Sequence, residues 1–151
     1  MEISSRIIES AKEIFSTMVM MEISVNDDHI TKTIALTDSI SGVIGLAGTY
    51  KGVLAIHIPN KVAMAITSSF LGMDVDTINE DVEDAVGELA NMLGGNVKSI
   101  LSDNGRDIDL SLPSTITGQQ YDFQPTKEAE RIIISFNCDA GEFAIDLQLE
   151  K

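Results

Sequence analysis

The sequence has little of what secreted proteins and membrane proteins require. Its single cysteine, Cys138, excludes an internal disulfide bond. No stretch approaches the roughly eighteen consecutive apolar residues of a membrane-spanning helix. The first residues also lack the charged start and apolar run of a signal peptide. We therefore expect a chain that has no membrane partner and that acts in the cytoplasm.

Positive charge is also scarce. The chain has 10 Lys and Arg residues against 24 Asp and Glu residues, and its formal net charge is −14. A field of that sign repels nucleic acids and anionic lipid surfaces, so neither is expected as a partner. A partner whose contact surface is rimmed by basic residues, or one that carries a metal ion, fits this charge better.

Several common catalytic and metal-binding motifs are missing. His29 and His57 are far apart in the sequence and have no cysteine at zinc-ligand spacing, which argues against a zinc site. There is no Gly-x-Ser-x-Gly elbow and no Gly-x-x-x-x-Gly-Lys phosphate loop. His57 alternates within a strand pattern and is interpreted as a structural residue, and Cys138 as a packing residue. We expect this chain to bind no metal and no cofactor of its own.

The residues that are present predict one domain over 1–151. The length and the hydrophobic content of 44% suffice for a sizeable core. The expected elements are, in chain order, helix 3–21, loop and strand 23–38, hairpin strands 41–48 and 52–58, helix 60–72, connector 73–80, helix 81–101, turn 102–105, strand 108–112, polar loop 114–129, and hairpin strands 131–138 and 142–149. Asn60 is expected to cap the middle helix, and Pro113 to shape the end of its strand.

The order of these elements nearly repeats, because each long helix is followed by strands that include a hairpin. This pattern predicts an α+β fold in which long helices pack on a mainly antiparallel sheet, built as an imperfect internal repeat. Superposing the two long helices aligns three polar positions of the first with three of the second: Glu9 with Asp84, Glu13 with Glu88, and Ser16 with Asn91. A chance match between two amphipathic helices is the alternative. If the match is real, the first copy has lost the amide and is the degenerate one.

One face of the helix over 81–101 carries the main chemical signal. Asp84, Glu88 and Asn91 stand at positions i, i+4 and i+7 and share one side of the helix, which Gly95 and Lys98 continue. We call these five residues the polar ridge. Its alternative interpretation is an ordinary solvated helix surface, because exposed carboxylates are the usual state of such a face.

Three glycines, Gly87, Gly94 and Gly95, interrupt this helix. Each interior glycine costs about 1 kcal/mol of helix stability relative to alanine, so a purely structural surface favours other residues. A missing side chain lets another backbone come close, which fits a docking surface. The competing interpretation is that a glycine relieves crowding within the fold.

The spacing from Asp84 to Glu88 and Asn91, with a gap of 21 residues to Pro113, resembles the signature of the CheC/CheX/FliY family of bacterial chemotaxis phosphatases. The expected order of helices and hairpins also matches this family over nearly the whole chain. Members of the CheC type carry two such motifs and members of the CheX type carry one. Because Ser16 replaces the amide in the first helix, the chain is most similar to the CheX type.

This resemblance implies hydrolysis of the phosphoryl group on the active-site aspartate of a CheY-like response regulator. Asn91 would orient the attacking water, Glu88 would pair with a lysine of the regulator, and Asp84, Gly95 and Lys98 would contact the partner. The resemblance also implies a homodimer, and Mg²⁺ held by the regulator. Two alternatives stay open. One is a non-catalytic adaptor or flagellar-switch-like module that binds a regulator through the polar ridge, and the other is a scaffold whose ridge is only solvated.

Overall fold

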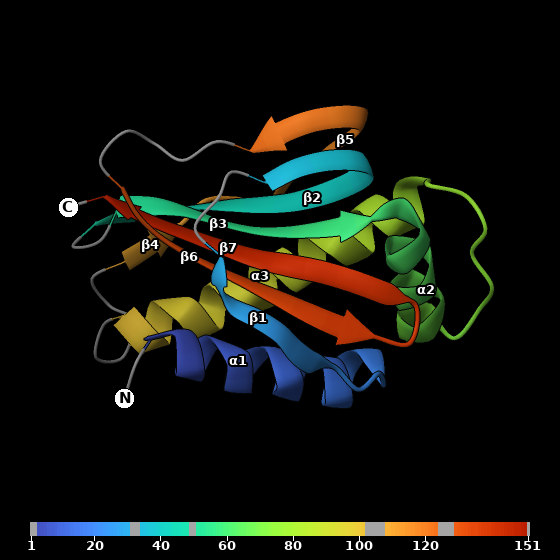
Figure 1. Cartoon of the computed structure of the whole chain (residues 1–151), viewed down its shortest axis with the longest axis horizontal. Coiled ribbons are helices and arrows are strands. Elements are labelled where there is room, and N and C mark those ends of the chain that lie inside the picture. The colour runs from blue at the N-terminus through green and yellow to red at the C-terminus, as the bar shows by residue number, and fades with distance from the viewer. Residues whose placement is uncertain (1–2, 31–33, 49–50, 102–107, 124–128, 151) are drawn as a thin grey trace.

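The computed structural model describes residues 3–30, 34–48, 51–101, 108–123 and 129–150 (Figure 1). The helical elements are α1 (Ile3–Ile14), the π-helical turn η1 (Phe15–Val19) that continues it, α2 (Asn60–Leu71) and α3 (Glu80–Leu101). The strands are β1 (Ser24–Ile30), β2 (Ile34–Gly48), β3 (Lys51–Pro59), β4 (Ile108–Leu110), β5 (Ser114–Phe123), β6 (Ala129–Cys138) and β7 (Gly141–Glu150). None of the helices in these ranges is long and apolar enough to cross a membrane.

The described strands pair antiparallel in one sheet of order β1-β6-β7-β3-β2-β4, and β5 pairs with the remaining part of β2. β3 and β7 pair at the centre of the sheet. The hairpin β2–β3 is flanked by β4, which follows α3 in the chain. The hairpin β6–β7 is flanked by β1, which follows α1. The order of the sheet is therefore alike from both ends, and the expected α+β fold with an imperfect repeat is confirmed.

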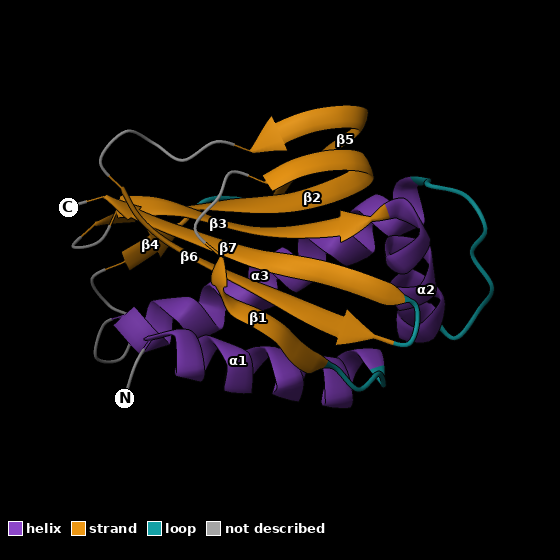
Figure 2. Cartoon of the chain, viewed as in Figure 1, coloured by secondary structure: helices purple, strands orange, loops and turns teal. Residues whose placement is uncertain are grey.

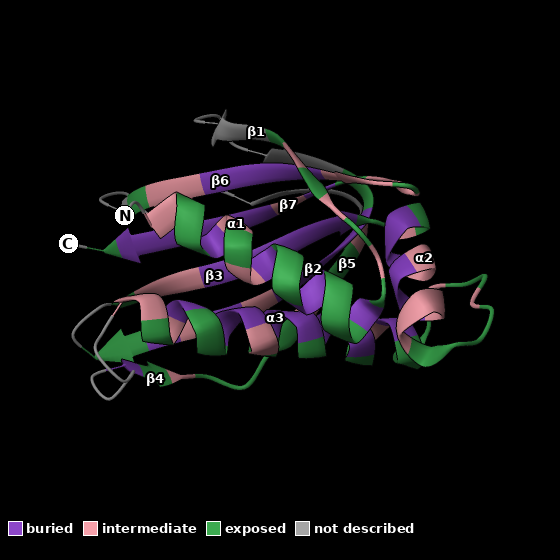
Figure 3. Ribbon diagram, turned by 90° about the horizontal axis from the view of Figure 1, so that it is seen from below, coloured by how far each residue is buried: buried purple, intermediate pink, exposed green. Residues whose placement is uncertain are grey.

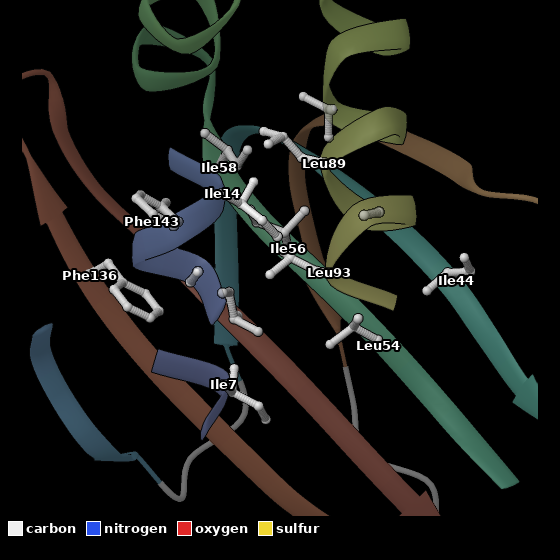
Figure 4. Packing of buried hydrophobic residues seen from close by; sticks show 14 of the residues in the cluster. Ile7, Ile14, Ile44, Leu54, Ile56, Ile58, Leu89, Leu93, Phe136 and Phe143 are labelled. Carbon is white, nitrogen blue, oxygen red and sulfur yellow. The ribbon is translucent and has the colours of Figure 1, made fainter. Parts of the chain in front are cut away.

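The helices lie on one side of the sheet, as Figure 2 shows, with α1 and α3 across one face and α2 at the end. Figure 3 shows α1 and α3 side by side, with exposed residues along their outer sides. The core fills the space between these helices and the strands, and Figure 4 shows Leu89 and Leu93 of α3 near Ile56 of β3. Phe143 of β7 stacks on Phe15, with 5.0 Å between the ring centroids. These apolar contacts fix both long helices on the sheet.

Two glycines allow α3 to lie close to β2. A Cβ added at Gly42 would lie 2.9 Å from the carbonyl oxygen of Val86 and 3.2 Å from the Cβ of Ala90. A Cβ added at Gly94 would lie 3.2 Å from Cγ2 of Ile44. The backbone oxygen leaves no room for a side chain at Gly42, and at Gly94 the packed side chain of Ile44 would have to move to admit one. For Gly94, the interpretation that a glycine relieves crowding within the fold is therefore the right one.

The ends of the helices show one confirmed boundary and one wrong prediction. α3 begins at Glu80, next to the expected start, and the Oδ1 of Asn79 accepts a hydrogen bond of 3.2 Å from the backbone N–H of Val82. This bond satisfies one of the free N–H groups at the helix start. Asn60 does not cap α2, because it is already the first helical residue and no side-chain cap forms there.

Two segments differ from their expected structure. Residues 114–123, expected as polar loop, form β5, because they pair with β2 over a long sequence distance that local polarity does not reveal. Residues 24–30, within the segment 23–38 expected as a loop followed by a strand, form β1, which among the described strands pairs with β6 alone and can tolerate polar residues as an edge strand. Both expected hairpins are confirmed as the β2–β3 and β6–β7 pairs. The expected turn at 102–105 lies outside the described residues.

Candidate functional site

The polar ridge lies on the solvent side of α3. Asp84, Glu88 and Asn91 are exposed, whereas the apolar residues of the helix are buried against the sheet and α1. Gly95, also exposed, and Lys98, half-buried, continue this side toward the end of the helix. The structure thus brings the five predicted residues onto one continuous surface, as the helical spacing requires.

An open cavity of about 400 Å³ lies beside the first half of the ridge. It is lined by Glu83, Asp84, Gly87, Glu88, Pro113 and Thr115. Pro113, which is far away in the sequence, reaches this place because it lies between β4 and β5 on the edge of the sheet next to α3. The motif residues Asp84, Glu88 and Pro113 therefore share one cavity.

The glycines of α3 have different surroundings. A Cβ added at Gly87 would meet only the Cβ of Pro113, at 3.9 Å, which is an ordinary contact. A Cβ added at Gly95 would meet nothing within 4 Å. The packing of this chain therefore does not require glycine at these two positions. Because glycine has no side chain, nothing projects from α3 at these two positions beside Glu88 and Asn91, which leaves space for a partner to approach.

Asp84, Glu88 and Asn91 have no polar partner within the part of the chain that the structure describes. The two carboxylates and the amide are therefore free to bind groups of another molecule. Their backbone is held firmly, because the neighbouring residues Leu89 and Ala90 are buried in the core. A rigid helix that presents open polar groups is a suitable platform for recognition or for the positioning of a water molecule.

The corresponding face of α1 differs in sequence and in local structure. Glu9 and Glu13 are exposed, but Ser16 lies in the π-helical turn η1, where the regular α-helical spacing ends. The hydroxyl groups of Ser16 and Thr17 both donate to the carbonyl oxygen of Glu13, at 3.2 and 2.7 Å. A cavity of about 240 Å³ beside the two acids is lined by residues of α1 and α3 and contains no proline. The face of α1 therefore differs from that of α3 in backbone geometry as well as in sequence.

A second polar cluster lies on the face of the sheet opposite the helices. The Oγ of Ser41 is 2.7 Å from Nδ1 of His57, and Nε2 of His57 is 3.2 Å from Oδ2 of Asp146. Arg131 donates two hydrogen bonds to the Asp146 carboxylate, of 3.1 and 2.8 Å. We call these four residues the buried network. Ser41, His57 and Asp146 are at most 1% exposed, so no substrate reaches them, and the prediction that His57 is structural is confirmed.

Burial and the hydrogen-bond partners of Asp146 shift its pKa in opposite directions. Burial alone raises the pKa of this carboxyl group, since it disfavours the charged form. Hydrogen bonds from His57 and Arg131, together with the positive charge of Arg131, outweigh burial and hold the pKa of Asp146 below its ordinary value. The carboxylate is therefore ionised at neutral pH and joins β3, β6 and β7.

The described part of the chain contains no group of three or more His, Cys, Asp or Glu residues that could hold a metal ion. The sequence had not singled out Glu83 and Thr115, which also line the cavity of the polar ridge. Glu83 precedes Asp84, and Thr115 lies two residues after Pro113. Proximity to the motif positions is thus the only sequence signal that marks them.

Known proteins with similar sequences or folds carry related names. The CheY-P phosphatase CheX of Thermotoga maritima is 25% identical over 118 residues, which cover 78% of this chain and 76% of that protein. The crystal structure of the chemotaxis protein CheX from Vibrio vulnificus has a TM-score of 0.88 and 28% identity, covering 99% of this chain and 100% of that one. A chain of the CheX–CheY–BeF3–Mg²⁺ complex from Borrelia burgdorferi has a TM-score of 0.78, with 99% of both chains covered. Its identity of 18% shows a shared fold alone.

The family described as chemotaxis phosphatase CheX matches residues 40–137. This range contains all of α3, the polar ridge and Pro113. Because the match extends over more than half of the sequence, this chain belongs to the chemotaxis phosphatase CheX family.

Proposed function

We propose that this protein hydrolyses the aspartyl phosphate of a CheY-like response regulator and that the polar ridge of α3 is its active surface. The observation that carries this proposal is the pair Glu88 and Asn91, both exposed on a rigid helix and without a polar partner among the described residues, with Glu88 in one cavity with Pro113. Membership of the CheX family supports it. The name of the Thermotoga relative gives CheY-P as that protein's substrate, and the Borrelia relative was crystallised with CheY.

Asn91 is proposed to orient the attacking water. An aspartyl phosphate is an acyl phosphate with a good leaving group, so its hydrolysis needs an aligned water more than a strong base. The amide of Asn91 has both a donor and an acceptor and can hold a water in line with the phosphorus atom. Because the amide is neutral, it adds no negative charge beside the phosphoryl oxygens.

Glu88 is proposed to hold the regulator in register. A carboxylate next to the phosphoryl group would be repelled by it, so Glu88 suits a different contact, with the lysine near the regulator's phosphorylation site. A charge-assisted pair of this kind in a closed interface contributes about 2–3 kcal/mol to binding. Asp84, Gly95 and Lys98 are proposed as further contacts along the same side of α3.

The Mg²⁺ ion of the reaction is proposed to belong to the regulator. Mg²⁺ prefers six oxygen ligands in octahedral geometry, which the carboxylates of one exposed helix face do not supply. Its chemistry in such a reaction is to neutralise charge on the phosphoryl oxygens. We also propose a cytoplasmic homodimer whose contact joins sheet edges away from the polar ridge and Pro113. A solution mass near twice the 16.3 kDa of one chain would support that dimer.

Phosphate release from a regulator tests the proposed function. The CheY-like regulators encoded in the same genome are phosphorylated with acetyl phosphate, the excess donor is removed, and inorganic phosphate is followed with and without this protein. We expect faster release with catalytic amounts of the protein. A protein that binds the regulator without faster release is an adaptor, and one that does neither is a scaffold; either result contradicts the proposal.

A further inference from the structure

Leu112 is the most exposed large apolar side chain of the described chain, with 87% of its surface accessible. It lies directly before Pro113, which lines the cavity of the polar ridge. Exposed single apolar residues are common on protein surfaces, so exposure alone carries no conclusion. The local backbone and its neighbours give this leucine a more specific meaning.

The leucine sits in a bulge at the edge of the sheet. Leu110 of β4 pairs with Leu46 of β2, and Ser114 of β5 pairs with Val43 of β2. Two residues of β2 therefore lie opposite the three residues 111–113. A bulge of one extra residue redirects the side chains at its position, and bulges occur often beside active sites. Here the bulge places Leu112 in solvent next to the cavity.

Hydrogen bonds hold the bulge in one conformation. The backbone N–H of Ser111 donates to the carbonyl oxygen of Gly45 at 3.0 Å, and the N–H of Gly45 donates to Oγ of Ser111 at 2.8 Å. The hydroxyl of Ser111 donates in turn to the carbonyl oxygen of Leu112 at 3.0 Å. Pro113 restricts the backbone on the other side. Because the backbone is already fixed, binding does not have to order this segment, and the ordering cost that remains is that of the leucine side chain.

The charges around the leucine indicate what it could bind. Glu83, Asp84 and Glu88 line the adjoining cavity, and Asp109 is exposed on β4. A partner that contacts Leu112 therefore needs an apolar residue next to basic residues. Such a partner would also lie against Glu88, because Glu88 lines the adjoining cavity. Interfaces commonly combine one apolar anchor with a nearby charged pair.

We propose that Leu112 is an apolar anchor for the receiver domain of the phosphorylated regulator. Its side chain contacts an apolar residue of the regulator beside the lysine that pairs with Glu88. This inference rests on the function proposed above. Leu112 touches no reacting atom, so it is a positioning residue: it strengthens docking and leaves the chemical step to Asn91.

The test compares Leu112→Ala with Leu112→Met and with the control Met73→Ala. Met73 is 56% exposed and follows α2, away from the cavity. Binding is measured to the regulator activated with beryllofluoride and Mg²⁺, and turnover to the regulator phosphorylated with acetyl phosphate. We expect Leu112→Ala to raise Kd and KM about tenfold and to change kcat by less than about twofold. Leu112→Met should restore most of the affinity, and Met73→Ala should behave as the wild type.

Each outcome separates this inference from the proposed function. Wild-type affinity in Leu112→Ala, or an equal loss in Met73→Ala, overturns the anchor while phosphate release still supports the phosphatase. If the wild-type protein releases no phosphate but Leu112→Ala binds the activated regulator more weakly than the wild type does, the anchor is supported and the phosphatase function is contradicted. A wild-type protein that neither binds nor hydrolyses the regulators contradicts both.

Discussion

The buried network has more of the groups usually found in enzymes than the polar ridge has. It contains a serine, a histidine and an aspartate joined by hydrogen bonds, whereas the ridge has two carboxylates, an amide, a glycine and a lysine. Yet Ser41, His57 and Asp146 are closed off from solvent and satisfied by one another. Asp84, Glu88 and Asn91 are open and have no partner in the described chain.

The difference teaches that residue types alone do not make a site, because a serine, a histidine and an aspartate can serve the fold when they are buried. A polar group buried in the fold must be paired, because an unpaired one costs about 1–3 kcal/mol. The buried network meets that requirement and joins strands. The ridge remains open on a rigid helix. Substitutions in the buried network should therefore lower the free energy of unfolding and leave the affinity for the regulator unchanged. Substitutions on the polar ridge should lower that affinity and leave the free energy of unfolding unchanged.

The largest expected effect belongs to Asp146→Asn. The substitution removes the negative charge that Arg131, whose side chain is only 9% exposed, contacts at 2.8 Å. Breaking a buried pair in this way lowers the free energy of unfolding by about 3–5 kcal/mol. Urea denaturation measures this loss, and affinity for the activated regulator should remain unchanged at temperatures where the variant is folded. A loss of stability below about 1 kcal/mol would show that the network is not structural.

Glu88→Ala should have the opposite profile. Without the carboxylate, affinity for the beryllofluoride-activated regulator should fall by about 2–3 kcal/mol, because the regulator's lysine is left unpaired in the interface. Calorimetric titration measures this loss. The thermal midpoint should stay close to that of the wild type, since Glu88 is exposed. Glu13→Ala on α1 is the matched control, and an equal loss of affinity in that variant would remove the distinction between α3 and α1.

The smallest expected effect is a pH dependence that belongs to Asp146. Because its pKa in the folded state lies below its ordinary value, the carboxylate contributes stability that is fully present above the unfolded-state pKa. That contribution is lost as the pH falls through the lower folded-state pKa. The difference in unfolding free energy between wild type and Asp146→Asn should therefore shrink as the pH drops below about 4. A difference that stays constant down to the acid transition would contradict the pKa direction.

The sequence predicts the ridge well because helical periodicity is local. The spacing of Asp84, Glu88 and Asn91 defines one side of α3 whatever the rest of the chain does. The difference between Ser16 and Asn91 at the aligned positions is visible in the sequence in the same way. The link to Pro113 came from the resemblance to a family, because no local rule brings a strand edge to a helix.

The features that could not be predicted depend on contacts far apart in sequence. β5 is a strand because β2 is its partner, and its own residues read as loop. The bulge at 111–113 arises where β2 changes partner from β4 to β5. The expected strand over 108–112 is therefore wrong at its end, because β4 stops at Leu110 and Leu112 is exposed. The order of the sheet follows from the central pairing of β3 with β7, which periodicity does not specify.

Single-turnover hydrolysis by Asn91→Ala, with Ser16→Ala as control, tests the proposed role of the ridge most directly. Both residues are exposed, Asn91 on α3 and Ser16 in the turn η1 that continues α1, so both variants should keep the fold and the affinity for the activated regulator. We expect phosphate release from the bound regulator to slow by about a hundredfold or more in Asn91→Ala and not at all in Ser16→Ala. Undiminished release by folded, regulator-bound Asn91→Ala would contradict the assignment of the water-positioning role to Asn91.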